Sequence, residues 1–390
     1  MLTALDRPLL ADTLAELGAD GWLLYDFRGV NPVAGRVVGA GGLGSRRLFV
    51  WLPREGTPVA VAHRIELQPL RDFPGRVVPY ARWEELHAAL GAIVARRTVA
   101  MEVSAEDAVP YLDRVPAGVV ELVRRLGGTV VPSGALVTTF AARWTSAEAD
   151  GHRRAAAALA EVAQAALRDA VGRGGTGYRE CALQGRVVDE LTARGLVLDH
   201  APIVAFGPTS ADPHYQPEPG HDRELAADDV VLLDLFAGEA PGAVQADQTW
   251  MAFSGATPPA DVIAVWEAVR DAREAAIALM QARVAAAAPV RGFELDRAAR
   301  AVLEGRGFGG AVLHRTGHSI DQSLHGSGPH LDDFETHDDR LLVPGVGFSV
   351  EPGVYLAGRF GMRSEVNMYW GPSGAEVTPP GRQETLILRA

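Results

Sequence analysis

The sequence predicts two domains, an α/β domain over residues 1–144 and an α+β domain with internal pseudo-two-fold symmetry over residues 145–390. Three observations support this fold class. A length of 390 residues favours more than one hydrophobic core. Helical and extended patterns alternate in the first part of the chain, and an Ala-rich helical pattern begins at Ser146.

The first domain is expected to alternate helices with strands. The expected helices cover residues 7–18, 82–96 and 117–126. The expected strands cover residues 21–25, 47–52, 57–62, 99–103 and 129–132. This interleaving predicts an α/β domain of modest size.

The second domain is expected to open with a long helix over residues 146–171. Ser146, followed closely by Glu148 and Asp150, is the expected capping box of this helix. A second long Ala-rich helix is expected over residues 260–288. These two helices predict where each half of the domain begins.

Weak internal similarity follows the two long helices. GYRECALQGRVVDELTARG at 177–195 resembles GFELDRAARAVLEGRG at 292–307, with about one helical turn fewer in the latter, and strands follow each. We expect two related halves with a site between them. A chance likeness between two Ala/Arg/Glu helices is the alternative.

Composition limits the partners. The net charge is −12, from 37 basic and 49 acidic residues, and no Lys/Arg run stands out, so nucleic acid and membrane are not expected partners. The single cysteine, Cys181, excludes an intrachain disulfide and is expected to be a buried inert thiol in a helix. The amino terminus lacks a signal-peptide pattern, and no apolar run approaches the ~20 residues that span a bilayer. A cytoplasmic location is expected.

Five residues carry the chemistry predicted for this chain. They are Asp234 in VVLLDLF, Asp247 in VQADQTW, His318 in HRTGHSI, Glu351 in FSVEPGVY and Glu365 in GMRSEVNMYW. Four carboxylates and one imidazole give a formal charge of −4, which two divalent cations would neutralise. Such a metal pair implies water activation and hydrolysis.

The two aspartates lie in apolar surroundings. Asp234 ends an apolar run, where a carboxylate is costly unless it is paired or binds metal. Asp247 lies across a turn segment, so a β-hairpin would bring both residues to one face. The alternative is a cap or turn aspartate at each position.

The two glutamates repeat this pattern. Glu351 and Glu365 are expected inside apolar strands joined by a hairpin, with Gly358 and Gly361 available for the turn. Two acidic residues placed in this way are not expected on the surface.

Three histidines lie in loops that contain Gly, Pro or Ser. A lone loop histidine such as His318 is more often structural than a ligand, but the four carboxylates favour a ligand role here. Considered alone, His214 and His325 would be surface loop histidines.

The five sequence frames resemble those of the pita-bread metallopeptidase family, which includes methionine aminopeptidase, Xaa-Pro aminopeptidase, prolidase and the metal-free creatinase. The resemblance covers about residues 145–390 and implies a pita-bread catalytic domain there. Residues 1–144 resemble the extra creatinase-like domain of the prolidase, aminopeptidase P and creatinase branch.

The resemblance implies two metal positions. Asp234 and Asp247 would hold one ion, His318 and Glu351 would complete the second, and Asp247 and Glu365 would bridge both. Glu351 would also contact the attacking water and relay its proton.

The resemblance also implies residues that contact the substrate. His214 and His325 would stabilise the tetrahedral intermediate or seat the substrate, and Arg363 would support the site. A dipeptide's free carboxylate needs a cation, which Arg359, Arg363 or His330 could supply.

The chain departs from the family pattern in several places. The spacing from Asp234 to Asp247 is 13 positions, two longer than the family pattern, and an even insertion in a hairpin preserves the face of each residue. Trp250 replaces an Arg, Asp321 replaces a Gly, and Gly326 replaces a Glu. These three changes are expected to surround the substrate and to affect specificity.

Together these patterns predict a dinuclear metal-dependent peptidase that hydrolyses Xaa-Pro bonds through a metal-bound hydroxide, most like an Xaa-Pro dipeptidase. We expect two divalent ions per subunit, manganese before cobalt or zinc. The expected substrate is a proline-containing dipeptide or short peptide, and the expected assembly is a homodimer. The alternatives are an Xaa-Pro aminopeptidase acting on longer peptides, a metal-free creatinase-like hydrolase, and a non-catalytic binding module.

Overall fold

The computed structural model describes residues 2, 5–39 and 44–389. The chain forms two compact units, Met1–Ala141 and Ala142–Ala390. The boundary expected from the sequence follows residue 144.

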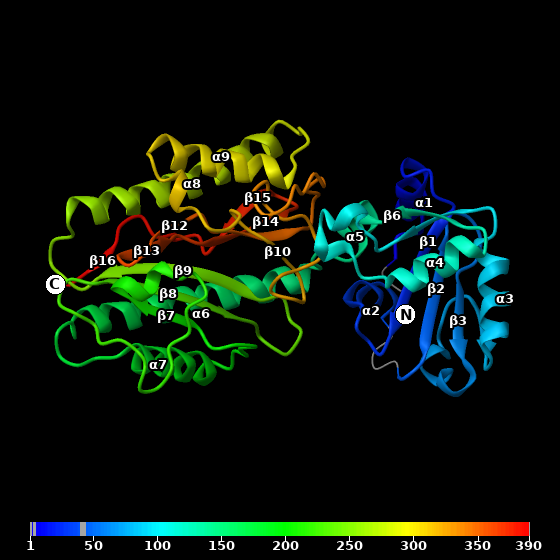
Figure 1. Ribbon diagram of the computed structural model, residues 1–390, viewed down its shortest axis with the longest axis horizontal. Coiled ribbons are helices and arrows are strands. Elements are labelled where there is room, and N and C mark those ends of the chain that lie inside the picture. The colour runs from blue at the N-terminus through cyan, green and yellow to red at the C-terminus, as the bar shows by residue number, and fades with distance from the viewer. Residues whose placement is uncertain (1, 3–4, 40–43, 390) are drawn as a thin grey trace. The chain divides into compact units, whose positions relative to one another are not determined.

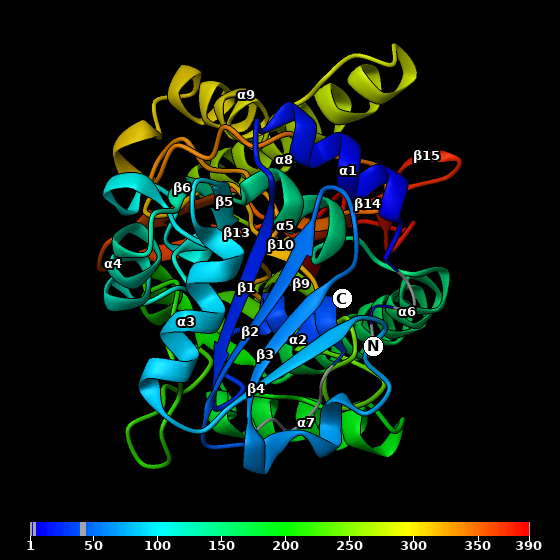
Figure 2. The same cartoon turned by 90° about the vertical axis from the view of Figure 1, so that its right-hand side faces the viewer.

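The first unit is built on one mixed six-stranded sheet, with strand order β4-β3-β2-β1-β5-β6 (Figure 1, Figure 2). Its strands are β1 (Gly21–Phe27), β2 (Arg47–Pro53), β3 (Val59–His63), β4 (Arg76–Tyr80), β5 (Thr98–Met101) and β6 (Thr129–Pro132). Its α-helices are α1 (Arg7–Glu16), α2 (Pro32–Val38), α3 (Trp83–Val94), α4 (Ala117–Arg125) and α5 (Gly134–Phe140).

Side-chain alternation gives this sheet two apolar faces. Trp22 and Leu24 of β1 pack into a core with α1, α2 and α5. Leu23 and Tyr25, the intervening residues, pack into a second core with α3 and α4. Helices on both faces of a sheet are the arrangement expected of an α/β domain.

The expected helices and strands of the first unit are present with small shifts at their ends, but α2, β4 and α5 were not predicted. Each is short, and each contains residues that disfavour its own structure. The sequence of α2 includes Gly35, β4 includes Pro79, and α5 includes the β-branched pair Thr138–Thr139.

The second unit contains two pairs of helices of matching length. The long helices α6 (Ser146–Val171) and α8 (Ala260–Ala285) have 26 residues each. The shorter helices α7 (Glu180–Ala193) and α9 (Gly292–Gly305) have 14 residues each, so the expected difference of one helical turn is wrong.

The cap of α6 also differs from the prediction. Thr145, not Ser146, is the N-cap, because its hydroxyl accepts a hydrogen bond from Glu148 N at 3.2 Å. The Glu148 carboxylate accepts one from Thr145 N at 2.7 Å, which completes the capping box one residue earlier than expected.

Two sheets and a hairpin complete the second unit. The first sheet contains β7 (Ile203–Phe206), β8 (Val230–Ala237), β9 (Ala246–Phe253) and β16 (Ile387–Leu388), in the order β16-β9-β8-β7. The second contains β10 (Ser319–Ile320), β11 (Gly347–Val350), β14 (Val366–Gly371) and β15 (Gly374–Thr378), in the order β10-β11-β14-β15. The hairpin pairs β12 (Gly353–Leu356) with β13 (Phe360–Arg363).

The strands of this unit lie between the two helix pairs, with α8 and α9 on the side opposite α6 and α7 (Figure 1). Leu233 and Trp250 face a core formed with α6 and α7. Leu232 and Met251 face the other core, which includes α8, α9 and strands of the second sheet. The hairpin β8–β9 therefore presents one face to its own helices and the other to the second half of the unit.

None of the helices in the described part of the chain is long and apolar enough to cross a bilayer.

Candidate metal centre

The predicted β8–β9 hairpin is present and places its two aspartates on one face. In the antiparallel ladder, Asp234 lies opposite Thr249, and Phe236 lies opposite Asp247. The aspartates are thus offset by two positions along the ladder rather than directly paired. Since side chains alternate along a strand, both carboxylates point away from α6 and toward the second half.

The two glutamates lie at the ends of paired strands. Glu351 follows β11 and Glu365 precedes β14, where Val350 pairs with Val366. The expectation that both glutamates lie inside strands is therefore wrong: the hairpin β12–β13 leaves the sheet between them. Gly358, with φ of 72°, is in the turn, as expected.

Gly361 is not in that turn. It belongs to β13, and a Cβ there would lie 2.1 Å from the carbonyl oxygen of Ser210. This glycine therefore permits the loop after β7 to approach β13 closely.

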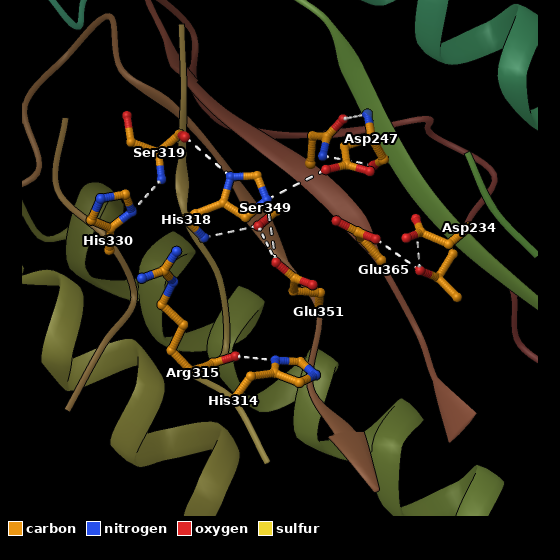
Figure 3. Close-up of polar contacts among 12 residues, drawn as sticks. Asp234, Asp247, His314, Arg315, His318, Ser319, His330, Ser349, Glu351 and Glu365 are labelled. Carbon is orange, nitrogen blue, oxygen red and sulfur yellow. Dashed lines mark hydrogen bonds and ion pairs between the residues drawn. The ribbon is translucent and has the colours of Figure 1, made fainter. Parts of the chain in front are cut away.

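His318 is fixed through its backbone and one ring nitrogen. Its N–H donates to Ser349 Oγ at 2.9 Å, and its carbonyl accepts from Ser349 N at 2.8 Å. His318 Nδ1 lies 3.1 Å from the carbonyl oxygen of Ser319, which can only accept, so Nδ1 carries a proton. Nε2 then faces Asp247 Oδ2 at 3.4 Å and Glu351 Oε1 at 3.3 Å (Figure 3).

The five predicted ligands converge on one place (Figure 3). Asp247, His318 and Glu365 each offer one ligand atom, and these atoms lie within 4.8 Å of one another. Glu351 adjoins this group through His318. Asp234 adjoins it through the hydroxyl of Thr249, which lies 3.3 Å from Asp234 Oδ1 and 2.8 Å from Glu365 Oε2.

The buried carboxylates are electrostatically unfavourable on their own. Burial, with repulsion from Asp247 and Glu351, raises the pKa of Asp234 to about 7. Burial and the other carboxylates also raise the pKa of Glu365 well above its usual value. Glu365 Oε1 is buried and has no hydrogen-bond partner in the described part of the chain. An oxygen-rich group with an unused carboxylate oxygen fits divalent cations.

Glu351 differs from the other carboxylates because positive groups surround it. Burial alone would raise the pKa of Glu351, but His318, His314 and Arg363 outweigh burial and lower it to about 2. The His318 pKa is raised, since Asp247 and Glu351 outweigh its burial. Glu351 is therefore ionised.

The guanidinium of Arg363 forms hydrogen bonds with residues in and beside the candidate centre. Its Nη2 contacts Asp234 Oδ2 at 2.6 Å, Nε donates to Thr249 Oγ1 at 2.8 Å, and Nη1 donates to Tyr355 Oη at 3.3 Å. The guanidinium is buried, and these contacts fix the ligand atoms around it. This geometry fits the supporting role expected for Arg363.

The other two candidates for the substrate carboxylate occupy different surroundings. Arg359 is exposed in the β12–β13 turn and forms an ion pair with Asp261. In the described part of the chain, no hydrogen bond or ion pair connects Arg359 to the five converging residues. His330 is fully buried, and its Nδ1 accepts from Ser319 N at 3.1 Å (Figure 3). Burial, together with Arg315 and Arg340, holds the pKa of His330 well below its usual value, so this imidazole is neutral.

The two loop histidines lie near the centre. The ring centroid of His325 is 4.2 Å from that of His318. The charge of His318 and burial lower the pKa of His325 to about 3, and His214 lies close enough to contribute to this effect. His214 itself is exposed, in the loop that follows the 3₁₀-helix η5 (Gly207–Ala211).

Several residues of the centre were missed in the sequence. His314 Nε2 lies 2.7 Å from Tyr355 Oη, and Ser349 Oγ donates to Glu351 Oε1 at 3.0 Å. Asn367 joins the two sheets, since its Oδ1 accepts from Asp247 N at 2.9 Å and its Nδ2 donates to Asp247 O at 2.8 Å. A polar residue inside the apolar run VNMYW was the available signal for Asn367.

The three departures from the family pattern have different surroundings. The expectation that Trp250 lies near the substrate is wrong: three positions after Asp247, it points to the opposite face and packs with α6. Asp321 accepts from Ser323 N and Ser327 N, each at 2.8 Å, across the loop that carries His325. A Cβ on Gly326 would lie 2.8 Å from Asp321 Cγ, so the aspartate and the glycine fit each other.

Cys181 is only partly buried, in α7, so the expected burial of its thiol is wrong. Burial and Asp222 nevertheless raise the pKa of Cys181, which disfavours the nucleophilic thiolate.

Comparison with known proteins identifies peptidases that are similar to this chain. "Probable dipeptidase PepE" of Mycobacterium tuberculosis is 30% identical over 320 residues, which cover 80% of this chain and 78% of that protein. "Xaa-Pro dipeptidase" of Lactobacillus helveticus is 29% identical over 192 residues, 49% of this chain and 48% of that protein.

Solved structures match the whole chain. Dipeptidase PepE from Mycobacterium ulcerans has a TM-score of 0.78 at 25% identity and covers 99% of this chain and 98% of its own. A prolidase from Thermococcus sibiricus has a TM-score of 0.70 at 23% identity, with 100% and 99% covered. The predicted pita-bread fold is confirmed. The model of metallopeptidase family M24 matches residues 150–370, and the chain therefore belongs to this family of metal-dependent peptidases.

Proposed function

We propose that this peptidase hydrolyses Xaa-Pro bonds at a dinuclear metal centre and acts mainly as an Xaa-Pro dipeptidase. The observation that carries the proposal is the convergence of four carboxylates, three of them buried, around His318, with Glu365 Oε1 left without a partner among the described residues. Two divalent ions would neutralise the formal charge of this group.

The ligand assignment is the one that the resemblance to the pita-bread metallopeptidases implies. Asp234 and Asp247 would hold one ion, His318 and Glu351 the other, and Asp247 and Glu365 would be shared. The deprotonated Nε2 of His318 is the nitrogen left for a metal, because Nδ1 donates to Ser319. Mostly oxygen donors with a single imidazole suit manganese, and cobalt and zinc also accept them. Bound divalent ions supply Lewis-acid activation of water and of the scissile carbonyl.

The protein's own groups handle the proton and the developing charge. Glu351 Oε1 accepts the proton of the attacking water and passes it to the leaving nitrogen. Ser349 Oγ, 3.0 Å from that oxygen, orients the carboxylate. The ring N–H of His325, beside His318, donates to the carbonyl oxygen as negative charge develops, and His214 seats the substrate next to it.

Specificity for proline depends on shape. The nitrogen of an Xaa-Pro bond carries no hydrogen, so a hydrogen bond to that nitrogen cannot select the substrate. The names of two relatives, "Xaa-Pro dipeptidase" of Lactobacillus helveticus and of Lactobacillus delbrueckii, support the choice of this bond.

Peptide turnover tests the specificity. With manganese supplied, Ala-Pro should be hydrolysed faster than Ala-Pro-Ala and faster than Ala-Ala. Hydrolysis of the tripeptide alone would favour the aminopeptidase alternative. Faster hydrolysis of Ala-Ala would remove the proline preference and leave a general dipeptidase.

The substitution Glu351→Gln tests the mechanism. It keeps the shape of the side chain but removes the proton acceptor, so kcat for Ala-Pro at saturating manganese should fall by roughly 10³-fold while the fold is retained. A fully active variant would contradict the role given to Glu351.

A further inference from the structure

We propose that two buried carboxylates outside the metal centre, Glu180 on α7 and Asp296 on α9, are positioning residues with separate tasks. Glu180 fixes the loop that presents His214, and Asp296 fixes the segments that present His318 and Glu351. The inference rests on the proposed function, because it assigns substrate contact to His214 and metal binding to His318 and Glu351.

Glu180 holds the His214 loop at both ends. It is fully buried, and Oε1 accepts from Phe206 N at 2.8 Å and from Thr209 Oγ1 at 2.5 Å, before His214. Oε2 accepts from Tyr215 Oη and from Arg223 N, each at 2.7 Å, after His214. One side chain therefore joins the start and the end of the segment 206–223.

Only a carboxylate satisfies this arrangement. Four donors approach two oxygens, and a carboxylate accepts at both oxygens. A glutamine has one accepting oxygen, so its NH₂ group would face a backbone N–H that cannot accept and a hydroxyl that would have to turn round to accept. Such a buried mismatch costs more than the loss of one hydrogen bond, and the loop must shift to relieve it.

Asp296 plays the corresponding part in the second half. It is fully buried, and its Oδ1 accepts from Thr316 N at 3.0 Å and from Thr316 Oγ1 at 2.6 Å. Its Oδ2 accepts from Asp333 N at 2.9 Å and from Arg300 Nε at 2.9 Å.

Thr316 connects Asp296 to two proposed ligands. Thr316 lies two residues before His318, and its carbonyl accepts from Glu351 N at 2.7 Å. Between them, Gly317 lies so close to the neighbouring strand that a Cβ would be 2.1 Å from Ser349 O. A shift of Thr316 is therefore passed on to both His318 and Glu351.

The positions of the two carboxylates differ by one helical turn for a steric reason. Glu180 is the first residue of α7, and the first residue of α9 is Gly292. A Cβ on Gly292 would lie 1.7 Å from the carbonyl oxygen of His330, so no side chain fits there. Asp296 lies four residues further along α9, where one turn of helix returns to the same face.

The test compares Glu180→Gln with Asp296→Asn. Isothermal titration with manganese chloride gives the metal affinity, and steady-state hydrolysis of Ala-Pro at saturating manganese gives kcat and KM. Glu180→Gln should lower kcat/KM by roughly 10-fold with unchanged manganese affinity, and Asp296→Asn should weaken manganese binding by roughly 10- to 100-fold. Glu102→Gln is the matched control, because Glu102 is a buried carboxylate whose side-chain partners among the described residues, Trp22, Asn31 and Ser133, all belong to the first unit.

His214→Ala separates the inference from the proposed function. If His214→Ala retains full kcat/KM, the role given to His214 is wrong. If it loses activity but Glu180→Gln does not, the role given to Glu180 is overturned. Asp296→Asn with normal manganese affinity overturns the second part.

Milder variants cover the case in which a carboxamide variant does not fold. Tyr215→Phe removes one donor to Glu180, and Thr316→Val removes one donor to Asp296. The first should lower kcat/KM with unchanged manganese affinity, and the second should weaken manganese binding, each by a few fold. Equal effects of both variants on both quantities would contradict separate tasks.

Discussion

The two halves of the catalytic unit share their helices but present their acidic residues differently. Each half has one helix of 26 and one of 14 residues. In the first half, Asp234 and Asp247 lie inside the regular eight-residue strands β8 and β9. In the second half, Glu351 and Glu365 lie where strands break. The candidate centre therefore combines ligands from a regular hairpin with ligands from an irregular one.

Asn367 and His152 are two of the buried side chains that join the halves. Asn367 of β14 bonds to the backbone of Asp247 in β9. His152 of α6 bonds through Nδ1 to Gln245 O at 3.0 Å, and through Nε2 to Thr378 Oγ1 of β15 at 2.7 Å. If both halves build the centre, removing a ligand from either half should weaken metal binding. Removing the contacts of Asn367 or His152 between the halves should lower stability.

The largest effect is expected from removing one ligand in each half. Asp247→Asn and Glu365→Gln should each weaken manganese binding by at least ~100-fold and abolish Ala-Pro hydrolysis, since each removes a charged donor. Metal titration and kinetics check this. Normal metal binding in either variant would mean that its half is not needed for the centre.

The joint at His152 makes stability depend on pH. Burial lowers the pKa of His152 to about 4 from 6.5, so the unfolded chain binds the proton more tightly than the folded one. The free energy of unfolding keeps the full contribution of neutral His152 above pH 6.5. It falls by roughly 3 kcal/mol in total as the pH decreases toward 4. Urea unfolding at pH 7, 6, 5 and 4 should show this loss. In His152→Gln the free energy of unfolding should change less with pH. The same pH dependence in both proteins would show that His152 does not cause it.

The joint at Asn367 should contribute less. Asn367→Ala leaves the buried N–H and C=O of Asp247 unpaired, which should lower the free energy of unfolding by roughly 2 kcal/mol and weaken manganese binding. Urea unfolding and metal titration measure both. A lower free energy of unfolding with unchanged manganese affinity would show that Asn367 stabilises the fold but does not support the metal centre.

In the irregular half, Asp321 and Gly326 should depend on each other. Gly326→Ala places a methyl group 2.8 Å from Asp321 Cγ and should lower kcat/KM several-fold by displacing the His325 loop, at a cost of about 1 kcal/mol or more. The double variant Asp321→Gly/Gly326→Ala should recover part of the loss. Strictly additive losses would argue against the pair.

The smallest effect on catalysis is expected from the far face of the regular hairpin. Trp250→Phe should lower stability by roughly 1–2 kcal/mol through lost packing against α6. The ratio of kcat/KM for Ala-Pro and Leu-Pro should stay the same. A changed ratio would place Trp250 near the substrate after all.

Regular structure was the part that the sequence could predict. The helix over 146–171 was predicted to the residue, and an acidic residue inside VVLLDLF indicated a buried carboxylate with partners. The alternation that puts Asp234 and Asp247 on one face also puts Trp250 on the other. That signal was present in the sequence, but it was not applied to Trp250.

The irregular half was harder because its contacts join distant residues. Glu351 and Glu365 were found, but the break between their strands depends on the hairpin β12–β13, with Gly361 against Ser210. The partners of Asn367 and Asp296 are likewise set by tertiary packing. No local periodicity encodes contacts over such separations.

The most direct test of a centre built by both halves is the number of metal ions that the protein binds. Purified protein, freed of metal and titrated with manganese, should bind two ions per chain, and Ala-Pro hydrolysis should rise with their binding. Binding of less than one ion per chain, or full activity without any, would contradict a dinuclear centre built from Asp234, Asp247, His318, Glu351 and Glu365.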